Sequence, residues 1–250
     1  ERVLGELEKA LLKAGRPSLF FSTLRFMGQL HCWFPELEEL IGIGQDRRYH
    51  AEGDVWEHTM LVLDEAAKLR HKACEPLAFM LAALCHDMGR ARCKDGDDDH
   101  AVAGIAVAES FLCRLTKETR LIKNVLNLVA MHMRPLELMY CQAGSESYNI
   151  MFDKVHDPDA LLLLVLADDS GRGSTVPSAM DISLLYRQLE EYRECMARPC
   201  VTGQDLLDAG LRPGRDFTDI LSFAHSLHLA GADKKEAMEK TLEYAKTHRN

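Results

Sequence analysis

Ala82-Ala83-Leu84-Cys85-His86-Asp87-Met88-Gly89-Arg90 is the stretch that decides how this chain folds. An apolar run that begins at about Pro76 ends on a histidine and an aspartate, and Gly89 is placed to terminate a helix there. A helix that is apolar on every side is normally buried. Two titratable side chains are therefore carried into the interior, where an uncompensated charge is costly. Taken alone, the pair would be a core histidine beside an exposed aspartate.

The composition is that of an ordinary globular protein. The chain has 250 residues, of which 47% are hydrophobic and 28% charged, so it can bury a large core. A net charge of −9 argues against a sequence-independent nucleic-acid clamp, which needs a basic face. The eight cysteines form no C-x-x-C pair, which favours reduced thiols in a cytoplasmic protein. No apolar run approaches the length of a membrane span, and we expect no membrane partner.

Nearly the whole chain is predicted to be helical, because Ala, Leu, Glu and Met dominate and no sustained β-branched alternation occurs. The expected fold class is all-α, a helical bundle with a small helical C-terminal extension. We expect N-terminal helices that pack on the core, a central metal-binding domain and the C-terminal extension at residues 1–47, 48–197 and 198–250. Residues 135–156 are expected to be a long connection. The helices expected around the site are 54–71, 76–88, 100–115, 117–133 and 157–168.

Several histidines and one aspartate share the face on which their own helix packs. Each falls on an apolar seam, and four of the five lie near a helix end: His58, His86, His100, His132 and Asp168. With Asp87, four histidines and two aspartates would point into one core. Such a group needs compensation, and divalent metal ions bind neutral imidazoles and carboxylates. The sequence therefore predicts that these six residues are metal ligands.

The order of these residues resembles the HD superfamily of metal-dependent phosphohydrolases, whose ligands follow the pattern H…HD…D on a helical bundle. His100 and His132 match the form of that superfamily that usually holds two metal ions. Further stretches are similar to the HD region of bacterial CCA-adding enzymes, so the resemblance covers residues 17–235. These stretches are Phe34-Pro35-Glu36-Leu37, residues 49–59, Ala167-Asp168-Asp169-Ser170-Gly171-Arg172-Gly173, and the tail segments 201–207 and 210–214.

Two features depart from the CCA-adding enzymes. Those enzymes carry an N-terminal nucleotidyltransferase head with paired catalytic aspartates, whereas Asp95 and Asp97 have D-x-D spacing in a loop with no β pattern before it. We therefore expect a stand-alone relative or a fragment that does not itself add nucleotides. Arg90 stands where the HD-x-G-K motif usually has lysine. Both residues are cationic, so contact with a phosphate is retained, although arginine prefers bidentate geometry.

The resemblance implies hydrolysis of a phosphomonoester or a 2′,3′-cyclic phosphodiester of a nucleotide or an RNA end, with a metal-activated hydroxide as the attacking group. We assign His58, His86, Asp87 and Asp168 to a first ion, with Asp87 as the bridge to a second ion. His100 and His132 complete the second ion's ligands. The candidate phosphate-binding residues are Arg90, Lys94 and Arg172. Mixed histidine and carboxylate ligands suit Mn, Fe, Co, Ni or Zn, and Mg less well, and the sequence leaves one or two ions open.

Two other functions stay open at this stage. Some HD-fold proteins with such a ligand set are di-iron oxygenases. The third possible function is a non-catalytic HD module that partners a tRNA nucleotidyltransferase. A pure scaffold, however, has no need to bury six such groups. The expected partners are a small phosphorylated substrate, above all a nucleotide, a tRNA or RNA terminus, and a second copy of the chain in a homodimer.

Overall fold

The computed structural model describes residues 2–45, 53–93, 100–172 and 180–248. Every regular element within these ranges is a helix, so the predicted all-α class is confirmed. None of the helices described there is long and apolar enough to cross a membrane.

The chain divides into two compact units, the first formed by residues 1–137 and 155–182 and the second by residues 138–154 and 183–250. The three-part division expected from the sequence stays a prediction. The helices of the first unit are α1 (Arg2–Lys13), α2 (Ser18–Phe26), α3 (Leu30–Trp33), α4 (Pro35–Glu38), α5 (Val55–Leu69), α6 (Pro76–Cys85), α7 (His100–Leu115), α8 (Thr119–Met131) and α11 (Pro158–Gly171), with 3-10 helices at Arg70–Lys72 and Met88–Arg92. The remaining helices are α9 (Arg134–Tyr140), α10 (Ser145–Asp153), α12 (Ile182–Ala197), α13 (Gly203–Asp208), α14 (Phe217–Leu229) and α15 (Lys234–His248).

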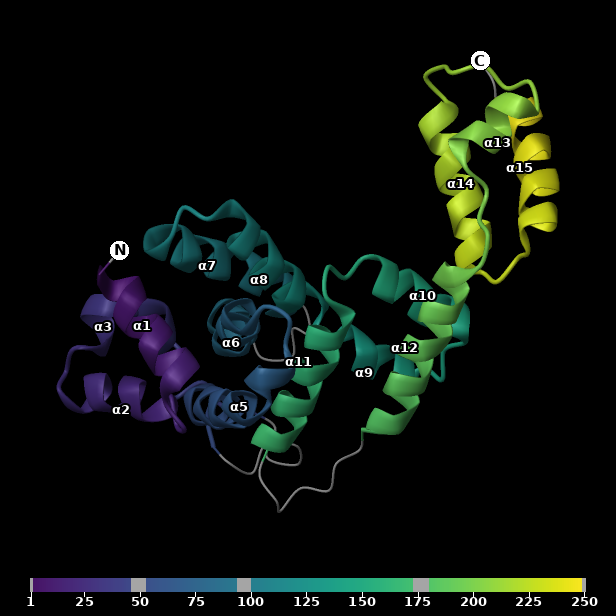
Figure 1. The fold of residues 1–250 in the computed structure, drawn as a ribbon. Helices are drawn as coiled ribbons and strands as arrows, with labels where there is room; N and C mark the ends of the chain where they lie inside the picture. Colours follow the sequence, from purple (N-terminus) through teal and green to yellow (C-terminus); the bar gives the residue numbers. More distant parts are fainter. Residues whose placement is uncertain (1, 46–52, 94–99, 173–179, 249–250) are drawn as a thin grey trace. The chain divides into compact units, whose positions relative to one another are not determined.

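Helix α6 is at the centre of the first unit. It packs against α5 and α8, and α11 packs against both α5 and α6 (Figure 1). Residues 78–85 are all buried, as the apolar run predicts. A helix with no polar face is stable only where other helices surround it, and this places the end of α6 inside the bundle.

Two helices around the centre, α5 and α11, begin at side-chain caps. The Asp54 carboxylate accepts a hydrogen bond of 2.9 Å from the Glu57 N–H at the start of α5. Asp157 does the same for the Ala160 N–H at the start of α11, at 3.0 Å. Each such cap satisfies an N–H group that the first helical turn leaves unpaired. The caps therefore fix where α5 and α11 begin, and so fix the register of the residues further along them.

Two details of the predicted helices are wrong. Helix α6 ends at Cys85 rather than Met88, because the backbone leaves helical geometry at Asp87 and continues as the 3-10 helix Met88–Arg92. Residues 135–156 contain helices α9 and α10 instead of a long connection. Their apolar side chains, such as Tyr148 and Phe152, are buried, and tertiary packing of this kind stabilises helices too short to be evident from periodicity.

The second unit contains a small apolar core formed by its C-terminal helices. Helix α14 packs against α15, and α13 begins with a capping box in which Thr202 and Asp205 satisfy each other's backbone N–H groups. The core residues are Val201, Leu206, Leu211, Ile220, Ala224, Ala237 and Ala245. Three of these seven side chains are alanines, and larger partly buried side chains such as Phe217 and Leu221 pack against them.

Candidate metal centre

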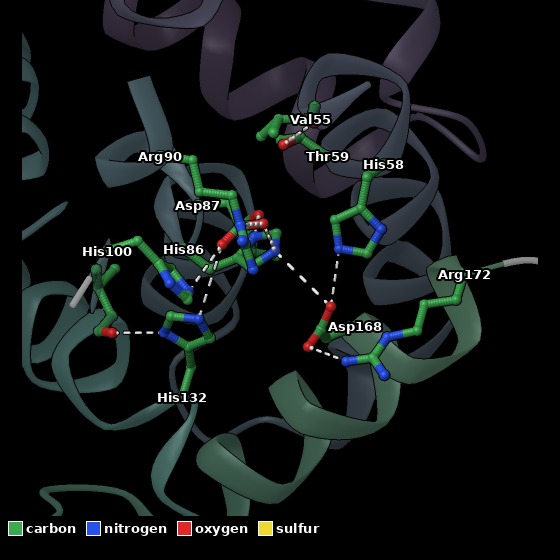
Figure 2. Close-up of polar contacts among 12 residues, drawn as sticks. Val55, His58, Thr59, His86, Asp87, Arg90, His100, His132, Asp168 and Arg172 are labelled. Atoms are coloured by element: carbon green, nitrogen blue, oxygen red, sulfur yellow. Dashed lines mark hydrogen bonds and ion pairs between the residues drawn. The ribbon is translucent and has the colours of Figure 1, made fainter. Parts of the chain in front are cut away.

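The six predicted ligands lie together in the first unit (Figure 2). They come from five helices, α5, α6, α7, α8 and α11, or from the residues directly after them. His58 is on α5, His86 caps α6, Asp87 follows it, His100 begins α7, His132 caps α8 and Asp168 is in the last turns of α11.

The potential ligand atoms form two groups. His58, His86 and Asp168 form one group, which we call the first ligand group, and Asp87, His100 and His132 form the second ligand group. Within each group the ligand atoms all lie within 4.8 Å of one another. Nitrogen and oxygen atoms so arranged can converge on an ion after small adjustments, since a protein–metal bond to these atoms is about 2.0–2.2 Å long.

The first ligand group is joined by a hydrogen bond. His58 Nε2 lies 2.9 Å from Asp168 Oδ1, and His86 Nε2 lies 3.9 Å from the same oxygen. The His58 and His86 rings are 5.5 Å apart between centroids. One carboxylate oxygen of Asp168 is therefore shared between two imidazoles that come from different helices.

Asp87 connects the two groups. Its Oδ1 lies 3.3 Å from His100 Nε2 and 3.9 Å from His132 Nε2, while its Oδ2 lies 3.7 Å from His86 Nε2. The sequence-based assignment gives Asp87 to the first ion and makes it the bridge. In the structure its carboxylate has one oxygen beside each group, an arrangement that suits a bridge.

Two histidines are held in the tautomer that a metal ligand requires. His86 directly follows α6 and its Nδ1–H donates to the Ala83 carbonyl at 2.9 Å, while His132 directly follows α8 and its Nδ1–H donates to the Val129 carbonyl at 2.7 Å. In a neutral imidazole with Nδ1 protonated, Nε2 carries the lone pair. Sequence reasoning did not identify these carbonyl contacts; the signal was a histidine directly after the last helical residue, where it can reach the free carbonyls of the last turn.

Four polar atoms of the centre are buried without a hydrogen-bond partner within the described residues: His86 Nε2, Asp87 Oδ1, His100 Nε2 and His132 Nε2. A buried acceptor that makes no hydrogen bond costs about 1–3 kcal/mol, and four at one place are unusual because buried polar groups are nearly always paired. All four atoms are of types that bind divalent transition metals. The residues present therefore fit a metal ion.

The electrostatics of the centre favour the ligating protonation states. Burial lowers the pKa of His86, His100 and His132. Burial by itself would raise the pKa of Asp87, but His86 and Arg90 are among the groups that hold it well below its usual range. The same holds for Asp168, where the hydrogen bond with His58 opposes the effect of burial on the pKa. At neutral pH these three imidazoles are thus neutral and the two carboxylates anionic, as metal ligation requires.

Two glycines allow the elements of the centre to approach closely. A Cβ on Gly89 would lie 1.9 Å from the His100 carbonyl oxygen, and a Cβ on Gly171 would lie 2.5 Å from Val62 Cγ2 on α5. Gly89 therefore lets the start of α7 lie against the 3-10 helix Met88–Arg92, and Gly171 lets α11 lie against α5. The sequence marked Gly89 as a helix terminator, whereas its structural role is this close approach.

Of the three candidate phosphate-binding residues, the structure places two, Arg90 and Arg172, beside the centre. Arg90 Nε donates to Asp87 Oδ2 at 2.7 Å, and Arg172 Nη2 lies 3.5 Å from Asp168 Oδ2. Arg172 also lines a small pocket together with His132 and Asp168, and its Nε is buried with no hydrogen bond among the described residues. Lys94 lies outside the described residues. Each arginine is therefore beside one of the two carboxylates.

Comparison with known families identifies the class of this fold and site. The chain contains an HD domain, which matches at residues 55–171 and so includes all six candidate ligands. HD domains bind divalent metal ions.

Curated proteins to which the chain is similar include bacterial multifunctional CCA proteins. Identity is 33% with that of Pasteurella multocida (strain Pm70), over 69% of this chain and 43% of the relative. It is 48% with that of Methylococcus capsulatus, over 36% of this chain and 20% of the relative. The protein of Actinobacillus pleuropneumoniae serotype 5b is 41% identical over 36% of this chain and 22% of its own length. The chain thus spans less than half the length of these curated relatives.

Proposed function

We propose that this protein is a metal-dependent phosphohydrolase that acts on a phosphomonoester or a 2′,3′-cyclic phosphodiester of a nucleotide or an RNA end. The observation that carries the proposal is the convergence of four unpaired buried ligand atoms on Asp87, His86, His100 and His132 within an HD domain. The relatives named as CCA proteins support a substrate related to tRNA or to nucleotides.

Residues of both ligand groups would hold the metal. His58, His86 and Asp168 would hold one ion, His100 and His132 a second, and Asp87 would bridge them. Divalent ions in such a site acidify a bound water and offset the charge that develops on phosphate oxygens.

The chain's own residues would orient the ligand histidines and the substrate. The Nδ1–H bonds from His86 to Ala83 and from His132 to Val129 hold both rings with Nε2 toward the centre, so that little reorganisation is needed on binding. Arg172 is beside Asp168 and lines the small pocket next to the centre. Its guanidinium would bind a phosphate oxygen there, because a planar fork of donors matches the geometry of phosphate.

A panel of substrates tests this proposal. Metal-loaded protein is incubated with p-nitrophenyl phosphate, bis-p-nitrophenyl phosphate, 2′,3′-cyclic AMP and 3′-AMP, and the release of p-nitrophenol or phosphate and the conversion of the nucleotides are measured. We expect turnover of a monoester or of the cyclic nucleotide that chelation abolishes. His71→Gln is the matched control, because His71 is an exposed histidine of the same unit outside both ligand groups, and it should keep full activity.

The same preparations distinguish the two other functions. Iron-dependent oxygen consumption without phosphoester turnover would identify an oxygenase and contradict the proposal. Absence of both bound metal and turnover, in a protein that still binds a tRNA nucleotidyltransferase, would identify a non-catalytic module.

A further inference from the structure

Arg90 contacts one residue of the ligand set, Asp87, through two hydrogen bonds. Its Nε donates to Asp87 Oδ2 at 2.7 Å, and its backbone N–H donates to the Asp87 carbonyl at 3.0 Å. The Asp87 side chain is fully buried, whereas that of Arg90 is 29% exposed. Arg90 is therefore at the edge of the site, and it holds a carboxylate that lies in the interior.

The contact determines which way the Asp87 carboxylate faces. With Oδ2 held by Arg90, the other oxygen, Oδ1, lies 3.3 Å from His100 Nε2 and 3.9 Å from His132 Nε2. Oδ1 itself accepts no hydrogen bond within the described part of the chain. Rotation of the carboxylate about its Cβ–Cγ bond would break the Arg90 bond and withdraw Oδ1 from both histidines.

We propose that Arg90 is a positioning residue, whose Nε fixes the Asp87 carboxylate so that Oδ1 completes the second ligand group. The proposal rests on the metal site described under the proposed function. It changes the role expected for Arg90 from the sequence, where it was a candidate for holding phosphate. The geometry assigns that role more directly to Arg172, which lines the pocket beside the centre.

Two substitutions separate the position of the donor from the charge. In Arg90→Gln, the amide Nε2 is the fourth side-chain atom from Cα, as Nε is in arginine, so the donor stays in place and the charge is lost. In Arg90→Lys, the fourth atom is a carbon, so the charge is kept and the donor moves one bond further out. If Nε positions Asp87, glutamine is the conservative substitution and lysine is not.

Manganese binding in the absence of substrate gives the direct test. Free Mn²⁺ is measured by electron paramagnetic resonance during titration of the metal-free protein. We expect Arg90→Lys to weaken one class of Mn²⁺ sites by about 10- to 100-fold, the range for residues that orient a metal ligand, and to weaken the other class less. Arg90→Gln should remain within about threefold of the original protein, below that range.

Arg92→Lys is the matched control. Arg92 lies on the same 3-10 helix, pairs with Glu39 at 2.7 Å and does not contact the centre, so its Mn²⁺ isotherm should equal that of the original protein. Thermal unfolding of all variants without metal should be alike, which separates positioning from loss of structure.

Two outcomes overturn the inference, and they differ from failure of the proposed function. If Arg90→Lys binds as the original protein does, or if Arg90→Gln is the weaker of the two, Nε does not position Asp87, although the metal site stands. If the original protein binds no divalent ion at either ligand group, the proposed function and this inference fail together.

Discussion

The two ligand groups of the centre are built differently. In the first ligand group, His58 and Asp168 are already hydrogen-bonded at 2.9 Å, and they stand on two helices, α5 and α11, that pack along each other. In the second ligand group, the Nε2 atoms of His100 and His132 have no hydrogen bond among the described residues. One group is held together by its own contacts, and the other by the elements around it.

The two ligand groups are therefore held in place by different contacts. The first ligand group depends on the close packing of α11 on α5, which Gly171 permits. The second depends on short-range supports: the carbonyl that holds His132, the Arg90 bond to Asp87, and the approach of His100 that Gly89 permits. Substitutions at these supports should therefore affect one group more than the other.

Removing one histidine from each group should have the largest effect. We expect His132→Ala and His58→Ala each to lower the bound metal from two ions to one and to reduce kcat/KM by more than about 100-fold, beyond the usual loss for residues that merely support a ligand. Metal content by mass spectrometry and turnover of the best model ester measure both effects. Variants that keep both ions would show that the histidine removed is not a ligand.

Adding a methyl group at each glycine should damage one group at a time. Gly89→Ala places Cβ against the His100 carbonyl and Gly171→Ala places it against Val62, and overpacking of this kind typically costs about 1–3 kcal/mol. We expect Gly89→Ala to impair the second ligand group and Gly171→Ala the first, in Mn²⁺ titrations combined with urea unfolding.

The control for these two variants is Gly5→Ala. Gly5 lies within helix α1 with no atom near its would-be Cβ, so alanine should stabilise the protein by about 0.5–1 kcal/mol. Equal metal binding by Gly89→Ala and the original protein would show that His100 does not depend on this close approach.

The stability of the metal-free protein should also depend on pH. Burial lowers the pKa of His86, His100 and His132 in the folded protein, so below a pH of about 6.5 the unfolded chain binds protons that the folded chain does not. Stability should therefore fall as the pH falls from 7.5 to 5.5, by up to about 1.4 kcal/mol per pH unit for each such group.

Urea unfolding in the presence of a chelator measures this slope. His132→Ala removes one of the groups that protonate on unfolding and should make the slope shallower. A free energy of unfolding that is constant between these pH values would contradict neutral buried histidines in the folded state.

The sequence was sufficient to predict which residues the structure brings together, because most of them are placed by local register. His58 and Asp168 fall on apolar seams of their helices, and His86 and His132 follow the last residue of theirs, so helical periodicity brings all four inward. His100 was predicted as the first residue of its helix, and α7 does begin there. The all-α class follows from the same periodicity.

The close approaches at the glycines and the Arg90 contact could not be predicted in the same way, since they depend on how successive elements are placed. The clash distances at Gly89 and Gly171 involve backbone or side-chain atoms of other helices, which no local pattern encodes. The contact between Arg90 and Asp87 requires the 3-10 geometry that follows α6, whereas the sequence indicated that the α-helix continued to Met88. The grouping of Asp87 with His100 and His132 likewise appears only once α7 and α8 are placed against α6.

The central claim is that Asp87 is the shared ligand of a divalent metal site, and metal analysis of the purified protein beside Asp87→Ala tests it most directly. The account predicts two bound transition-metal ions in the original protein, and loss of at least one ion together with phosphoester hydrolysis in a folded Asp87→Ala. A protein that binds no transition metal, with folding and hydrolysis unchanged in Asp87→Ala, would contradict it.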